Sequence, residues 1–173
     1  MATQTGRQRQ GRYLALSMVV LLMAHAGCGK ARTPDRWIIP EGHRGWIKID
    51  YLVKSAPELP IQDGHRIIRF PDSGYLQTSS AQLDGWASDE FLMESPEHRT
   101  AMARTISGQG GNLWDGASEA EIVAGANGTF QTTSRFLSQC YFVGAEQHYK
   151  NSDDCRSRKW PIVEDNQRVP LSK

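Results

Sequence analysis

The sequence predicts a small antiparallel β-sandwich with one or two short helices. Three observations lead to this fold class: one cleanly alternating segment, several short strand-like segments at close spacing, and turn chemistry between them. In GWIKIDYLV (45–53), apolar residues alternate with Lys48 and Asp50, which is the period-two pattern of a strand with one buried face. Many short strands with few convincing helices are typical of two packed sheets.

The segments that follow this strand predict a connection and then a hairpin. SAPELPIQDG (55–64) holds two prolines and an Asp-Gly pair, which favour a connection. HRIIRF (65–70) and YLQTSS (75–80) are strand-like, and PDSG (71–74) between them is a turn sequence. The proline fixes φ, the aspartate caps the local backbone, and the glycine accepts a positive φ.

The second half of the chain is less periodic. EFLM (90–93) and RTAMARTI (99–106) predict short strands, whereas SEAEIVA (118–124) and AEQHYK (145–150) predict a turn or two of helix. RFLSQCYFVG (135–144) predicts a late buried strand, although its apolar spacing also suits a helix. Asn127-Gly128, just before that segment, is a hairpin signal.

The first 27 residues have the layout of a secretory signal. Arg7, Arg9 and Arg12 precede a weakly polar to apolar stretch (13–26) that contains no acidic residue. The stretch is too short for a transmembrane helix, which needs about 20 apolar residues. We therefore expect the protein to be exported.

Two cleavage sites compete at the end of this signal. Ala24-His25-Ala26 fits ordinary signal peptidase, which would leave a secreted protein beginning at Gly27. Ala26-Gly27-Cys28 instead resembles the lipobox of bacterial lipoproteins, in which the cysteine receives a diacylglycerol thioether and becomes the first mature residue. His25 departs from that box, where an aliphatic residue is usual.

The odd number of cysteines favours the interpretation as a lipoprotein. The chain has three cysteines, Cys28, Cys140 and Cys155, and an odd cysteine is a liability in an oxidising compartment. Acylation of Cys28, with palmitate or a similar chain, would leave the other two as one pair. Export makes that disulfide plausible, and a bridge over such a loop is worth about 3 kcal/mol.

We therefore expect an envelope lipoprotein, attached to the membrane through a lipid on Cys28 and facing the periplasm or the exterior. The mature chain would keep 17 of the 20 basic residues and all 19 acidic ones, a formal net charge of −2. That charge offers no basic excess for a nucleic-acid partner. The expected organisation is a signal (1–27), a polar tether (28–36), a β-sandwich domain (37–155) and a C-terminal tail (156–173).

Four segments together resemble an uncharacterised bacterial family, the domain of unknown function 6843. They are IPEGHRGWIKIDY (39–51), LPIQDGHRIIRFPDSGYLQTSS (59–80), GWASDEF (85–91) and YFVGAEQHY (141–149). The resemblance spans about residues 38–150 and is looser between Arg99 and Phe130. It implies a short, exported, lipoprotein-like chain with a shared fold. It implies no activity and therefore no catalytic residues.

The residues themselves show no catalytic or metal-binding signature, so we predict no cofactor and no metal. Nucleophile motifs such as Gly-x-Ser-x-Gly are missing, and the histidines are scattered without ligand spacing. A non-catalytic binding or structural module is the preferred function. The alternative is an envelope hydrolase or metal-dependent enzyme whose site assembles His43, His65 or His98 with Asp89.

Trp46, Trp86 and Trp114 are the candidates for ligand binding. An exposed tryptophan can stack on sugars, peptides or lipid. Each of the three lies beside a glycine or an Asp-Gly corner, where a large ring often closes the end of a small β-core instead. Whether the partner is a protein or a glycan stays open.

Overall fold

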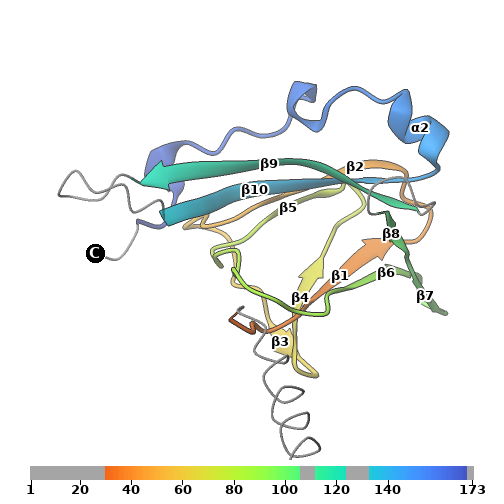
Figure 1. Ribbon diagram of the computed structural model, residues 1–173, viewed down its shortest axis with the longest axis horizontal. Helices are drawn as coiled ribbons and strands as arrows, with labels where there is room; N and C mark the ends of the chain where they lie inside the picture. Colours follow the sequence, from red (N-terminus) through yellow and green to blue (C-terminus); the bar gives the residue numbers. More distant parts are fainter. Residues whose placement is uncertain (1–29, 106–111, 124–132, 171–173) are drawn as a thin grey trace, which may run out of the picture. The chain divides into compact units, whose positions relative to one another are not determined.

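The computed structural model describes residues 30–105, 112–123 and 133–170, and the compact unit begins at Ala31 (Figure 1). The unit is mainly β, as predicted, and its described residues form two five-stranded sheets, one short helix and two 3-10 turns. No helix in these described ranges is long and apolar enough to cross a membrane.

The first sheet has the strand order β3-β4-β1-β6-β7. Its strands are β1 (Asp35–Pro40), β3 (Ile61–Gln62), β4 (His65–Arg69), β6 (Glu90–Glu94) and β7 (Arg99–Ala101). The second sheet has the order β5-β2-β10-β9-β8. Its strands are β2 (Gly45–Asp50), β5 (Tyr75–Gln77), β8 (Arg104–Thr105), β9 (Leu113–Val123) and β10 (Thr133–Val143).

Both sheets are mixed, whereas the sequence predicted antiparallel ones. β1 runs parallel to β4 and β6, β2 runs parallel to β5, and β8 runs parallel to β9. For the pairs β1–β4, β1–β6 and β2–β5 the reason lies in the path of the chain, which crosses between the sheets after β1, β2, β4, β5 and β7. A strand that returns to its own sheet by way of the other one can pair in parallel without a long helical crossover.

The predicted hairpin of 65–70 and 75–80 is wrong for the same reason. β4 belongs to the first sheet and β5 to the second, so the turn at 71–74 carries the chain between sheets instead of pairing its two neighbours. The predicted turn at 71–74 is confirmed, because Gly74 has a φ of 71° and its N–H donates to the carbonyl of Pro71.

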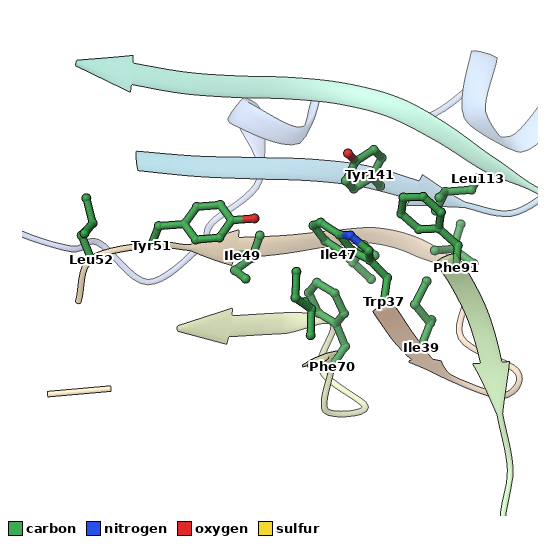
Figure 2. Close-up of a cluster of buried hydrophobic side chains, with 12 residues drawn as sticks. Trp37, Ile39, Ile47, Ile49, Tyr51, Leu52, Phe70, Phe91, Leu113 and Tyr141 are labelled. Carbon is green, nitrogen blue, oxygen red and sulfur yellow. The ribbon is translucent and has the colours of Figure 1, made fainter. Parts of the chain in front are cut away.

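The main core lies between the two sheets (Figure 2). Ile47, Ile49 and Tyr51 are fully buried in it, while Lys48 and Asp50 point to the other face, as the alternation predicted. The first sheet contributes a stacked group around Trp37, whose ring lies 5.8 Å from Phe70 and 5.6 Å from Phe91. Other members of this core are Ile39, Leu52, Ile68, Leu113, Tyr141 and Val143.

A second cluster lies on the opposite, outer face of the second sheet. This outer cluster consists of Trp46, Trp114, Cys140, Phe142 and Cys155, with Tyr149 and Trp160 packed against it. Cys140 and Cys155 are joined by a disulfide. α2 (Glu146–Lys150) and the 3-10 turns Cys155–Ser157 and Asp165–Gln167 run over this face (Figure 1).

The long ribbon of β9 and β10 replaces the helix predicted at 118–124. β9 continues through Val123 and pairs antiparallel with β10, so the ladder overrides the local helical tendency of this segment. The expected Asn127-Gly128 turn lies outside the described residues, although Val123 and Thr133 on either side of it are partners in the ladder.

Packed structure extends on both sides of the expected 37–155 domain. β1 begins at Asp35, which is buried. At the other end, Arg168 forms a bridge with Val53, and the Val169 N–H donates to the carbonyl of Leu52 at 2.6 Å. The segment expected as a peripheral tail therefore contacts the second sheet.

Candidate functional site

A cavity of about 240 Å³ lies between the outer face of the second sheet and residues 155–168, which we call the covering segment. β2 contributes Lys48 and Asp50 to its walls because these residues alternate with the core-facing isoleucines. The remaining polar lining residues are Glu119, Ser138, Arg156, Arg158 and Arg168.

Two buried, oppositely charged side chains line this pocket. Asp50 is 1% exposed; its Oδ2 accepts a hydrogen bond from the Tyr75 hydroxyl at 2.5 Å, and its Oδ1 lies 3.2 Å from Lys48 Nζ as an ion pair. Arg168 is 8% exposed and donates from Nη1 to the carbonyl of Tyr51 at 2.9 Å.

One atom of each of these side chains is left without a hydrogen bond, although Asp50 Oδ1 is ion-paired with Lys48. Asp50 Oδ1 and Arg168 Nε have no hydrogen-bond partner among the described residues. Buried polar atoms in native proteins are nearly always satisfied, so each such atom calls for an explanation. In a pocket, a bound polar molecule provides one.

The charge of the lining favours an anion. Four cationic and two anionic side chains line the pocket. Lys48 is paired with Asp50 and Arg156 with Asp154, so among the described residues Arg158 and Arg168 are the lining cations with no carboxylate partner, while Glu119 accepts from Ser138 Oγ at 3.0 Å. An excess of positive charge in a partly enclosed cavity attracts negative ligands.

The protonation of Tyr75 is fixed by its surroundings. Burial raises the pKa of the Tyr75 phenol well above its ordinary value, and the hydrogen bond to Asp50 raises it further. The phenol therefore stays a neutral donor at physiological pH, which keeps Asp50 Oδ2 occupied.

The covering segment is attached to the sheet at several points. The disulfide ties Cys155 to Cys140 of β10, and Trp160 Nε1 donates to the carbonyl of Cys155 at 2.9 Å. The Trp160 ring stacks on Tyr75, with centroids 5.7 Å apart. Arg158 lies 5.2 Å above the Trp160 ring, which holds this guanidinium at the wall of the pocket.

Two of the three tryptophans considered for ligand binding are buried. Trp46 and Trp114 are 6% and 7% exposed and pack against the Tyr149 ring. Their Nε1 atoms donate to the carbonyls of Asp153 and Gly144, each at 2.8 Å. Trp86 is 75% exposed and lies beside Ala31, so the three rings do not form one site.

The histidines expected for an enzyme site form separate pairs. His65 Nε2 lies 3.4 Å from Glu90 Oε1, and His98 Nε2 lies 3.1 Å from Glu41 Oε1. His43 lies against Gly74, and its Nε2 has no hydrogen-bond partner among the described residues.

Asp89, the carboxylate that the alternative enzyme site would use, belongs to a part-buried network at the start of β1. It accepts from Arg32 Nη2 at 2.5 Å and from the Asp35 N–H at 2.9 Å. Within the ranges that the structure describes, no group of three His, Cys, Asp or Glu side chains is placed to hold a metal.

A family model described as "Family of unknown function (DUF6843)" matches residues 31–151, about seven-tenths of the chain. The chain belongs to this family. The matched region of the family domain contains both sheets and α2, and it ends before Cys155. The covering segment therefore lies beyond the match.

A solved structure also resembles this family member. It is the crystal structure of a protein from Bacillus anthracis described as "Putative Lipoprotein". The two chains are 19% identical, the alignment covers 80% of this chain and 85% of that one, and the TM-score is 0.44. A likeness of this size carries no argument about function. No curated protein matches the chain.

Sequence reasoning found one wall of the pocket and missed the rest. The alternation in 45–53 placed Lys48 and Asp50 together on the outer face. Arg168 could not be connected with them, because 118 residues separate it from Asp50 and the tail carries no periodic signal. The disulfide was the only sequence signal that brought the start of the covering segment to β10.

Proposed function

We propose that this protein is an exported envelope lipoprotein, anchored to a membrane through an acylated Cys28, whose domain binds a small anionic ligand without catalysing a reaction. The observation that carries the binding role is the buried Arg168 Nε, which has no hydrogen-bond partner among the described residues and belongs to a pocket with excess positive charge.

The pocket limits the size and the chemistry of this ligand. A cavity of about 240 Å³ is slightly smaller than the usual range for drug-sized ligands, which begins at about 300 Å³. A carboxylate or phosphate group would receive hydrogen bonds from Arg168 Nε and Arg158. A donor on the same molecule, such as a hydroxyl or ammonium group, would add a hydrogen bond to Asp50 Oδ1, which is ion-paired with Lys48.

The anchor is supported by the sequence and by the disulfide. The chain has three cysteines, and the bond between Cys140 and Cys155 leaves Cys28 without a cysteine partner in the same chain. Cys28 follows a stretch with the layout of a secretory signal, at the position where a lipobox carries its lipidated cysteine.

A non-catalytic role is favoured over the enzyme alternative by the separation of the candidate groups. His65 and His98 contact different glutamates, and Asp89 contacts Arg32 and a backbone N–H. A general base needs a reacting proton within hydrogen-bond reach, and these side chains do not converge on one position.

Isothermal titration calorimetry with inorganic phosphate and with acetate tests the binding role. The two variants are Arg158→Gln at the pocket and Arg99→Gln on β7 as a matched control, because both replace an arginine outside the buried core. We expect Arg158→Gln to weaken binding about tenfold, the effect of losing one charged hydrogen bond. Equal binding by both variants, or no binding of either anion to the unaltered chain, would overturn the proposal.

A further inference from the structure

Three large apolar side chains are exposed near the start of the folded unit. Trp86 is 75% exposed, Ile61 is 71% exposed and Leu83 is 36% exposed. Among the described residues, the other large exposed hydrophobic is Ile162, which lies on the covering segment. We call Ile61, Leu83 and Trp86 the tether-side patch.

Backbone contacts bring this patch to the point where the chain enters the domain. Ala31 and Trp86 form a β-bridge, and the Arg32 N–H donates to the carbonyl of Trp86 at 3.1 Å. Ile61 is the partner of Arg66 across β3 and β4, and Arg66 Nη1 donates to the carbonyl of Ala81 at 2.5 Å. Ile61 and the 81–86 segment therefore both adjoin Arg66.

A network of buried and part-buried charges holds this arrangement. Arg66 donates to both carboxylate oxygens of Asp35, at 2.7 Å and 3.1 Å. The Asp89 carboxylate accepts hydrogen bonds from the Arg32 guanidinium and from the Asp35 N–H. Because these groups fix residues 31–35 against the 81–89 segment, Trp86 has a defined position beside Ala31.

The short covalent path to Cys28 determines what can cover the patch. Cys28 precedes Ala31 by three residues, and three residues of extended chain span at most about 11 Å. The polar layer on each side of a bilayer is itself about 5–8 Å thick. A lipid on Cys28 would therefore hold the Trp86 backbone close to the lipid headgroups.

We infer that the tether-side patch rests on the lipid surface of the membrane to which Cys28 is attached. This inference depends on the anchor of the proposed function. Tryptophan suits the position, because its amphipathic ring is enriched at the level of the headgroups. Ile61 and Leu83 would add apolar contact with the acyl boundary.

The contact would also orient the ligand pocket. The two sheets face each other (Figure 1). The patch belongs to the first sheet and the loops beside it, whereas the pocket lies on the outer face of the second sheet, across the core. A domain that rests on the patch presents its pocket away from the bilayer, toward soluble ligands.

Quenching of tryptophan fluorescence tests this contact. The full acylated chain is placed in vesicles of phosphatidylcholine and phosphatidylglycerol, with and without bromine on the acyl chains. We expect brominated lipid to quench the unaltered protein, Trp86→Phe to abolish that quenching, and Trp160→Phe on the far face to leave it unchanged. The mass of the N-terminal peptide is measured on the same samples.

The other possible results distinguish a failure of the lipid contact from a failure of the anchor. An acylated chain that is not quenched overturns the lipid contact and leaves the anchor intact. A chain that carries no acyl group overturns the anchor and this inference together. Shielding of Trp86 that depends on protein concentration, without quenching, would assign the patch to a second copy of the chain and overturn the lipid contact.

Discussion

Arg66 donates two hydrogen bonds to Asp35, from Nε at 2.7 Å and from Nη2 at 3.1 Å, and both residues are at least 95% buried. The two residues are partners in the register of β1 and β4. The same aspartate is linked to Asp89 through its backbone N–H. This pair therefore joins three segments of the first sheet at the point where the chain enters the domain.

Removing the carboxylate of this pair should destabilise the folded protein. Asp35→Ala leaves the Arg66 guanidinium buried with one remaining contact to a backbone carbonyl, and we expect it to lower the free energy of unfolding by about 3–5 kcal/mol. Urea denaturation measures the loss. The control is Glu146→Ala, which breaks an exposed pair with Lys150 and should cost at most about 1 kcal/mol. Equal losses for the two variants would contradict the role of the buried pair.

The disulfide should hold the covering segment to the sheet. Replacing both Cys140 and Cys155 by serine opens a 15-residue loop and should cost about 3 kcal/mol in urea denaturation. Peptide maps of the unaltered protein should differ between reducing and non-reducing conditions by one linked pair of peptides. Identical maps would show that the bridge does not form.

Gly116 tests the packing of Trp46. A Cβ added at Gly116 would lie 2.5 Å from Trp46 Cζ3 and 2.9 Å from the carbonyl oxygen of Cys140. We expect Gly116→Ala to lower the free energy of unfolding by about 1–3 kcal/mol and to change the near-ultraviolet circular dichroism of the tryptophans. Gly64→Ala is the comparison, because its Cβ meets open space and only the positive φ of 74° is strained. An unaltered tryptophan signal in Gly116→Ala would mean that Trp46 is not held against this position.

Acidification should lower the free energy of unfolding, in part through protonation of Glu94. The hydrogen bond from Arg69 lowers the pKa of Glu94. Desolvation raises this pKa in part, and the hydrogen bond from Arg99 lowers it further. The folded state then keeps this carboxylate ionised below the unfolded pKa of about 4.3. Its contribution is fully present above that pH and is lost as the pH falls through the folded pKa.

Urea denaturation between about pH 6 and pH 3 measures that loss. Glu94→Gln cannot titrate, so its stability should fall less on acidification than that of the unaltered chain. Glu146→Gln is the control, because Glu146 is paired with one exposed lysine, Lys150, instead of two arginines. Parallel curves for Glu94→Gln and the unaltered chain would contradict the role of Glu94.

The parts of the fold that were predictable from sequence are those set by periodicity and by composition. Ile47, Ile49 and Tyr51 face the core because side chains alternate along a strand, and this does not depend on which sheet the strand joins. The disulfide followed from the number of cysteines and the expected export.

The predictions that were wrong concern features that depend on contacts between segments distant in the sequence. The turn at 71–74 was recognised, but turn chemistry does not say whether the next strand pairs with the previous one, and here β5 joins the other sheet. Residues 118–123 form a strand because β10 provides a continuous partner. Trp46 and Trp86 both lie beside a glycine in the sequence, yet one is buried and the other is exposed.

The central claim is that Cys28 carries the membrane anchor, and labelling with fatty acid tests it most directly. Cells that make the full chain or its Cys28→Ala variant are grown with radiolabelled palmitate and then fractionated. We expect label and membrane association in the unaltered chain, with a mature N-terminus at an acylated Cys28, and neither in the variant. Unlabelled, soluble protein that begins at Gly27 would contradict the account.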